Sequence, residues 1–454
     1  MSWWRRRARR RQQVEDEDTV DIEMSVTIIL CTTEDEQRRR SSFVGCRFIP
    51  RDRFSGYHRL MVDYFAHVPV FAEDIFRRRY CAILIVIVFS VVHLVHGFTC
   101  TSPAVRFRMC KAMFLDISND LNQDFEYFQR WSNHAGVPGF AIIQKVTAAV
   151  RMLAYGGAAD MFDEYVRMRE STMIECLNHF TRAVIEKYGD TYRRQPNDDD
   201  IARLLHKAEQ RGFPGMLGSI DCMHWEWEKC PTSWHGQYRG HHKKPTIILE
   251  AVASYDRWMW HAFFGMPGSC NDINVLHRSP VFDSIASGTG PPVTYFVNGN
   301  EYNMGYYLAD GIYPSWATLI NGVPRPQSNK HKYFTQKQSE YRKDVECAFG
   351  RIQSMWGIMK GPARLWNPVD LNCIVECVVI LNNMGIQYEA NMEHISNEEY
   401  QSFSDEATIS LPGTRNISEI ARLIEGHKLI QSRAANEELK ADLIEHVWNF
   451  NGST

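Results

Sequence analysis

The stretch Gly215-Met-Leu-Gly-Ser-Ile-Asp221 decides the fold, because it is a short apolar run that follows a proline and ends in an acidic residue. Short apolar runs bounded by glycine, proline or asparagine predict strands. Three further runs of this kind follow, at residues 246–253, 258–264 and 306–310. Helical periodicity then returns at residues 342–359 and 371–384. The sequence therefore predicts an α/β domain at residues 205–392, with helices packed on a sheet.

A helical region precedes this domain, because apolar residues recur at intervals of three and four across residues 56–195. Residues 144–155 and 160–167 form two helices in this interpretation, and a capping box of Ser171-Thr172 with Glu175 starts a third. Three helices with short turns suit a helix-turn-helix module, and a plain helical bundle fits the same pattern equally well. The outer segments are a disordered charged arm at residues 1–55 and a polar tail at residues 393–454.

Charge and cysteine content restrict the function only weakly. The 454 residues include 51 basic and 54 acidic side chains, so a net charge of −3 gives no global electrostatic case for binding nucleic acid. The 12 cysteines lack a repeated short spacing, which indicates reduced thiols in a cytosolic or nuclear protein. Cys373 and Cys377 are four residues apart in an apolar helical pattern, which favours core packing over half of a metal site.

Two N-terminal features allow more than one interpretation. Arg5–Arg7 and Arg9–Arg11 suit a solvated tail or a patch for nuclear import or for the DNA backbone. Residues 81–98 are uncharged and long enough for a marginal membrane span. The flanking segments join into one continuous segment if residues 80–105 are removed. We interpret residues 80–105 as translated intron or an insertion, and expect no membrane association.

Three acidic residues form the candidate catalytic site. Asp221 and Asp310 each end a predicted strand, and Glu346 lies in a predicted helix. Carboxylates at strand ends and on a facing helix can converge on two hard cations, which activate water and stabilise the leaving oxygen in phosphodiester cleavage. Oxygen ligands favour Mg²⁺ or Mn²⁺ over zinc.

Four ordered motifs resemble those of PIF/Harbinger-type transposases, in the plant transposon-protein branch. They are Arg211-Gly-Phe-Pro-Gly-Met-Leu-Gly-Ser-Ile-Asp-Cys-Met-His-Trp-Glu-Trp227, Gly265-Met-Pro-Gly-Ser-Cys-Asn-Asp-Ile-Asn-Val-Leu276, Leu308-Ala-Asp-Gly-Ile-Tyr-Pro314 and Asp344-Val-Glu-Cys-Ala-Phe-Gly350. The resemblance covers about residues 57–80 and 106–390. It implies an RNase H-like catalytic domain, a mixed sheet flanked by helices, whose DDE triad holds two Mg²⁺ or Mn²⁺ ions and cuts and rejoins DNA at transposon ends.

The resemblance also assigns roles to individual residues. The family's first Asp falls on Asp221, its second on Asp310 and its Glu on Glu346, with 35 residues (311–345) between the last two. A further family aspartate matches Asp272, which the resemblance makes a metal ligand. An Asn-Asp pair after Pro-Gly-Ser is also common in turns and helix caps.

Two lysines extend the prediction to DNA contact, since Lys243 and Lys244 form a basic loop that can hold phosphates. The resemblance implies a nuclear protein that acts with a Myb-like partner, and a homo-oligomer is also expected. Cys347 stands where the family usually has Arg, and Asn382 where it usually has His. These departures favour an alternative function, that of a domesticated and catalytically idle nuclear DNA-binding or scaffolding protein.

Overall fold

The computed structural model describes residues 51–73, 75–76, 109–132, 134, 136–240, 243–288, 293–392 and 425–452. The arginine clusters of the N-terminal arm and the apolar stretch at residues 80–105 lie outside these ranges, as does the first part of the predicted tail, so their interpretations stay predictions.

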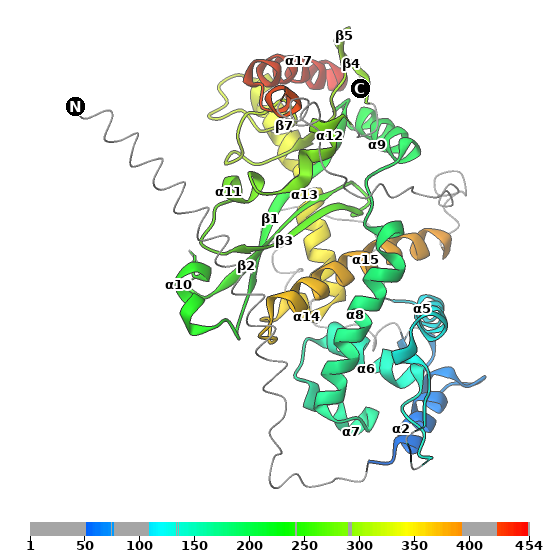
Figure 1. Cartoon of the computed structure of the whole chain (residues 1–454). Coiled ribbons are helices and arrows are strands. Elements are labelled where there is room, and N and C mark those ends of the chain that lie inside the picture. Colours follow the sequence, from blue (N-terminus) through cyan, green and yellow to red (C-terminus); the bar gives the residue numbers. More distant parts are fainter. Residues whose placement is uncertain are drawn as a thin grey trace. The chain divides into compact units, whose positions relative to one another are not determined.

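A five-stranded mixed sheet forms the centre of the α/β region (Figure 1). Its order is β3-β2-β1-β6-β7, in which β1 pairs antiparallel with β2, β2 pairs antiparallel with β3, and β6 and β7 continue parallel to β1. The strands are β1 (Met216–Glu226), β2 (Thr246–Ala253), β3 (Met259–Pro267), β6 (Tyr306–Leu308) and β7 (Leu319–Ile320). A separate hairpin joins β4 (Tyr295–Val297) to β5 (Asn300–Tyr302). The prediction of an α/β fold with a mixed sheet flanked by helices is thus confirmed.

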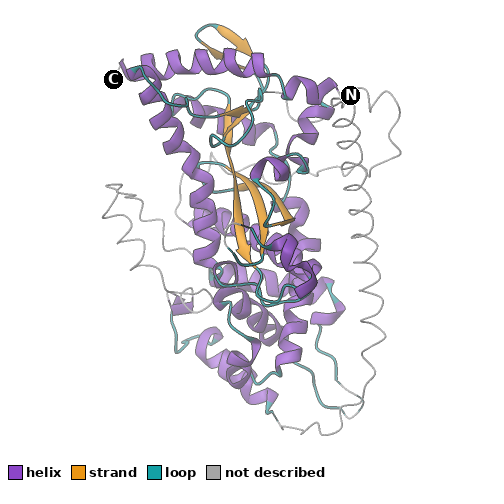
Figure 2. Cartoon of the chain, turned by 90° about the vertical axis from the view of Figure 1, so that its left-hand side faces the viewer, coloured by secondary structure: helices purple, strands orange, loops and turns teal. Residues whose placement is uncertain are grey.

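Long helices flank the strands (Figure 2). Helix α13 (Asn329–Met355) packs on β1, and α15 (Pro368–Met392) packs on β3 and on α8 (Glu170–Tyr192). One buried side chain, that of Asn383, fixes how α15 packs on β3 and α8. Asn383 of α15 accepts a hydrogen bond from the backbone N–H of Met259 at 2.9 Å and donates to the carbonyls of Met259 and Tyr192. Because no water reaches Asn383, these bonds fix α15 between the sheet and α8.

Helix α15 is apolar enough to resemble a membrane span. Within the described part of the chain, residues 368–390 are the one helix that meets the length and hydropathy of a span, with a mean hydropathy of 1.5. However, 72% of the 18-residue stretch of this helix that meets the hydropathy criterion is buried inside the protein. Such burial is typical of the core helix of a globular domain.

The helices before the sheet share its hydrophobic core. They are α2 (Arg53–Leu60), α5 (Lys111–Asp124), α6 (Ile142–Tyr155), α7 (Asp163–Val166) and α8. One cluster of buried side chains runs from Leu60 through Phe180 to Trp258 and beyond. The predicted capping box is wrong, since α8 begins at Glu170 with Arg169 as its N-cap and no side-chain cap bond. Whether α6–α8 bind DNA stays a prediction.

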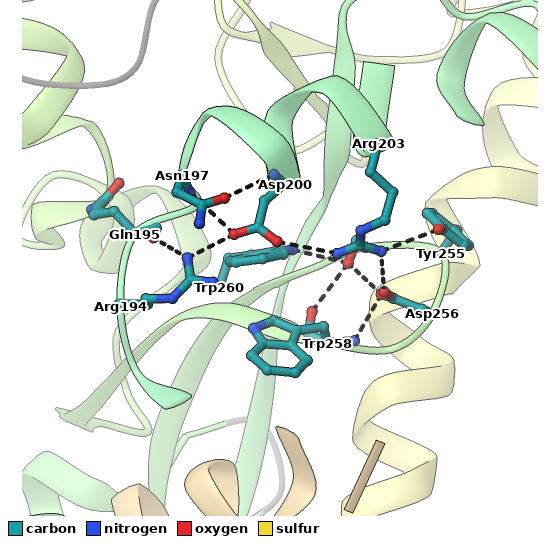
Figure 3. Close-up of polar contacts among 10 residues, drawn as sticks. Arg194, Gln195, Asn197, Asp200, Arg203, Tyr255, Asp256, Trp258 and Trp260 are labelled. Atoms are coloured by element: carbon teal, nitrogen blue, oxygen red, sulfur yellow. Dashed lines mark hydrogen bonds and ion pairs between the residues drawn. The ribbon is translucent and has the colours of Figure 1, made fainter. Parts of the chain in front are cut away.

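A polar network ties α9 (Asp198–Gln210) to the β2–β3 turn (Figure 3). At the start of α9, Asn197 and Asp200 cap each other's backbone N–H groups. Arg203 then joins the helix to the turn, since its Nη1 lies 2.7 Å from Oδ2 of Asp256. Asp256 also accepts from the hydroxyl of Ser254. Residues 197–200, which lie between the predicted helical and α/β domains, therefore form a structured helix start.

The C-terminal part of the described chain contains a helix, α17 (Arg433–Gly452), which packs on α13, β4 and β7. The buried side chain of Asn436 donates to the carbonyls of Trp316 and Leu319, at 2.7 Å each. Asp442 accepts hydrogen bonds from Asn300 and Tyr302 of the hairpin. Residues 433–452, which were expected to belong to a polar tail, thus cover one edge of the sheet.

Candidate acidic site

Parallel pairing brings Asp221 and Asp310 to the same level of the sheet. Strand β1 pairs with β6 so that Ser219 lies opposite Leu308. Asp221 is two residues beyond Ser219, and Asp310 is two residues beyond Leu308. Asp221 therefore lies within β1 and Asp310 just after the end of β6, close enough for the charge of Asp310 to act on Asp221. Oδ1 of Asp310 accepts the backbone N–H of Ile312 at 2.9 Å, which holds its side chain in the turn after β6.

Glu346 lies on α13, which packs along β1. The buried hydroxyl of Ser219 accepts the backbone N–H of Val345 at 3.0 Å, and Gln353 contacts the sulfur of Met223 further along. These two contacts set α13 along β1. Glu346, which follows Val345, therefore lies beside Asp221.

Arg342 lies between Asp221 and Glu346. Nη1 of Arg342 is 3.2 Å from Oδ2 of Asp221, and its Nη2 is 2.9 Å from Oε1 of Glu346. The side chains of Asp221 and Arg342 are 19% and 20% exposed, whereas that of Glu346 is 44% exposed. The part of the site on β1 is therefore largely buried, whereas the part on α13 is accessible to solvent at Glu346.

Burial dominates the electrostatics of Asp221. Desolvation raises the pKa of its carboxyl group from 3.8 to about 6. The backbone hydrogen bond from Cys222 and the charge of Arg342 lower this pKa, and the charges of Glu346 and Asp310 raise it. Glu346 and Asp310 thus both act electrostatically on Asp221, and Arg342 compensates part of the charge of Asp221 and Glu346.

Asp272 lies on another side of Asp310. It is the first residue of the short helix α11 (Asp272–Leu276), whose N-cap is Asn271. Burial raises the pKa of Asp272, a hydrogen bond with Cys222 lowers it, and the charges of Asp310 and Glu250 raise it further. Cys222 follows Asp221 on β1, so its side chain points to the opposite sheet face. Asp272 thus approaches Asp310 from the face opposite Asp221.

Glu250 is a charged residue of this second face that sequence reasoning missed. It pairs with Cys222 across β1 and β2, and its side chain is fully buried. Neither carboxylate oxygen accepts a hydrogen bond, and Nε2 of His261 lies 3.4 Å from Oε2. The only feature of the sequence that points to this buried carboxylate is a single acidic residue inside the apolar run Ile247-Ile-Leu-Glu-Ala-Val252.

The chemistry of the carboxylates suits Mg²⁺ or Mn²⁺, since hard cations prefer oxygen ligands. Their arrangement does not yet form a metal site. Among the residues that the structure describes, no three His, Cys, Asp or Glu side chains converge closely enough to hold a metal ion. Two of the candidate ligands, Asp221 and Glu346, instead converge on Arg342. The carboxylates are therefore ligands of the type that Mg²⁺ and Mn²⁺ prefer, but their geometry in this structure does not match a metal site.

The two predicted DNA-contacting lysines lie apart from the acidic residues. Lys243 is exposed and has a left-handed backbone, with φ of 58°. Nζ of Lys244 lies 2.8 Å from Oε1 of Glu226, at the far end of β1. Both side chains are accessible to solvent, and their predicted contact with phosphates stays a prediction.

The two departures from the family pattern occupy different environments. Cys347 is exposed on α13 beside Glu346. Asn382 is fully buried on α15, where its Oδ1 accepts from Nε of Arg351 and its Nδ2 donates to the carbonyl of Arg257. Asn382 therefore has a structural role, and its hydrogen bonds do not involve the acidic residues.

The fold and the acidic residues together define an α/β protein with a carboxylate-rich site at the junction of β1, β6 and α13. Residues 190–393 match the family model described as plant transposon protein. This match covers the whole sheet and somewhat less than half of the chain, and it supports a transposon-derived protein. No curated protein and no solved structure matches the chain.

Proposed function

We propose that the protein is a divalent-metal-dependent DNA nuclease and strand transferase of the PIF/Harbinger type, which cuts phosphodiester bonds at transposon ends. The observation that carries this proposal is that Asp221 lies on β1, Asp310 lies two residues after the parallel strand β6, and Glu346 lies on the helix α13 that packs on β1. When bound, Mg²⁺ or Mn²⁺ supplies charge that activates water and stabilises the leaving oxygen.

The topology supports the RNase H-like part of the proposal. Three antiparallel strands, β1 to β3, are extended by two strands parallel to β1, and long helices flank them. In this arrangement Asp221, Asp310 and Glu346 act as the DDE triad, and Asp272 is a further ligand. Lys243 and Lys244 contact DNA phosphates, and the protein acts in the nucleus as a homo-oligomer with a Myb-like partner.

The second candidate is a domesticated protein that binds DNA or scaffolds a nuclear complex with an idle acidic site. Two observations favour it. The acidic residues do not converge as a metal site in the described part of the chain, and Arg342 pairs with two of them.

Plasmid nicking by the full-length protein tests the two candidates. We expect cleavage in Mg²⁺ or Mn²⁺ that is lost in Asp221→Ala and in Glu346→Ala. Glu340→Ala is the matched control, because Glu340 is on the same helix but pairs with Lys337. Metal binding without cleavage by the unmodified protein would favour the idle alternative, and equal cleavage by all variants would reject the assigned triad.

A further inference from the structure

We propose that Arg342 is an internal counter-cation that competes with divalent metal ions for Asp221 and Glu346. In this view the metal-free site is held together by the guanidinium, which must leave both carboxylates before a cation can bind them. The inference rests on the proposed function, because it concerns the same acidic site, and it names a residue that controls metal entry.

The geometry of the guanidinium carries the argument. Its two terminal nitrogens contact two carboxylates from different elements, Asp221 on β1 and Glu346 on α13. Guanidinium has several donors in one rigid plane, so a single arginine can bridge two carboxylates in this way. A lysine has one compact charge and cannot reproduce the bridge.

The backbone places Arg342 in this position. Arg342 and Glu346 are four residues apart on α13, so their side chains share one helix face. The hydrogen bond from Val345 to Ser219 holds the same turn of α13 against β1. Rotation of the arginine side chain is therefore the simplest route by which it can leave, and its partial exposure leaves space on the solvent side.

Both oxygens of Asp221 have hydrogen-bond donors in this state. Oδ1 accepts the backbone N–H of Cys222 at 2.9 Å, and Oδ2 accepts Arg342. A cation bound at either oxygen of Asp221 would share the carboxylate with these donors, and the charge of the guanidinium would repel it. Cys222 donates from the backbone of a central strand, so Arg342 is the donor that can move. This arrangement also explains why the carboxylates do not yet converge on one point.

Mn²⁺ titration of the full-length metal-free protein tests the proposal. For Arg342→Ala and Arg342→Gln we expect Mn²⁺ to bind about tenfold more tightly than in the unmodified protein, as measured by calorimetry. Thermal unfolding in EDTA gives a second readout that is independent of activity. We expect both variants to melt at lower temperature than the unmodified protein, since Asp221 and Glu346 then lack their shared counter-ion. We also expect Mn²⁺ to raise the melting temperatures of the variants more than that of the unmodified protein.

Lys337→Ala is the control, because it breaks an ion pair with Glu340 on the same helix, 3.0 Å in length, without removing a contact of the acidic residues. It should bind Mn²⁺ as the unmodified protein does. Equal or weaker binding by both Arg342 variants would overturn the counter-cation role while leaving the metal site intact. If neither the unmodified protein nor any variant binds Mn²⁺, the counter-cation proposal and the nuclease proposal fail together.

Discussion

The backbone N–H of Val345 donates to the hydroxyl of Ser219 at 3.0 Å, in a position that no solvent reaches. This bond joins α13 to β1 within two residues of Asp221 and directly beside Glu346. This buried hydroxyl group therefore helps to set the spacing between Asp221 and Glu346.

Ser219→Ala should lower the free energy of unfolding by about 1 kcal/mol, because one buried hydrogen bond is lost. Urea denaturation measures this change. Thr294→Ala removes a hydroxyl that bonds Asn303 on the surface, so it should change stability by less than about 0.5 kcal/mol. Equal effects of the two substitutions would show that the Ser219 bond does not hold α13.

The raised pKa of Asp221 predicts a pH-dependent difference from Asp221→Asn in EDTA. Folding favours the protonated carboxyl, so its contribution is fully present below about pH 4 and is lost as the pH rises through about 6. The unmodified protein should therefore lose about 3 kcal/mol relative to Asp221→Asn between about pH 4 and about pH 7. Urea unfolding across this range measures the difference, and a constant difference would contradict the assignment.

Glu250→Gln should stabilise the protein by about 1–2 kcal/mol, because it replaces a buried carboxyl group whose oxygens accept no hydrogen bond with an uncharged amide. Thermal and urea unfolding check this result. Glu301→Gln, an exposed change of the same chemistry, should have little effect. A loss of stability in Glu250→Gln alone would contradict this prediction and show that the contact of Glu250 with His261, 3.4 Å away, stabilises the fold.

Arg203→Ala should lower the free energy of unfolding by about 3 kcal/mol, because it leaves the nearly buried Asp256 without its ion pair. Arg182→Ala breaks an exposed pair of similar length with Asp370 and should cost at most about 1 kcal/mol. Urea denaturation of the two variants provides the comparison. Costs of the same size would indicate that the network of Figure 3 is screened by solvent.

Strands with mainly apolar sequences were the easiest elements to predict. The predicted strand at residues 246–253 coincides with β2, in which every side chain is buried. The first strand extends five residues past its predicted end at Asp221 to Glu226, because residues 222–226 continue to pair with β2. Pairing with a neighbouring strand depends on the tertiary structure, so the local sequence does not predict it.

The polar first half of α13 was harder to predict. The helix begins at Asn329 with Ser328 as its N-cap, well before the predicted start at Arg342. Few apolar residues mark this part of the helix, so its periodicity is weak.

For the site, the sequence predicted that Asp221 and Asp310 each end a strand. This was only partly right, because Asp221 lies within β1 and Asp310 lies two residues after the end of β6. The bridge through Arg342 could not be predicted, because it depends on one side-chain conformation and on how α13 lies across β1. Glu250 was missed for a related reason. An acidic residue in a central strand is uncommon, and a single sequence does not show why it is kept.

Helix α17 has a consequence for the order in which the chain can fold during synthesis. Strand β7 is the edge of the sheet, and an unpaired edge is a template for association with other chains. The carbonyl of Leu319 on this edge is covered by Asn436, which is translated much later. While the ribosome is still adding the segment between them, the nascent sheet has an uncovered edge. We therefore expect slow translation or truncation before residue 433 to promote aggregation of nascent chains, even though the strands themselves are complete.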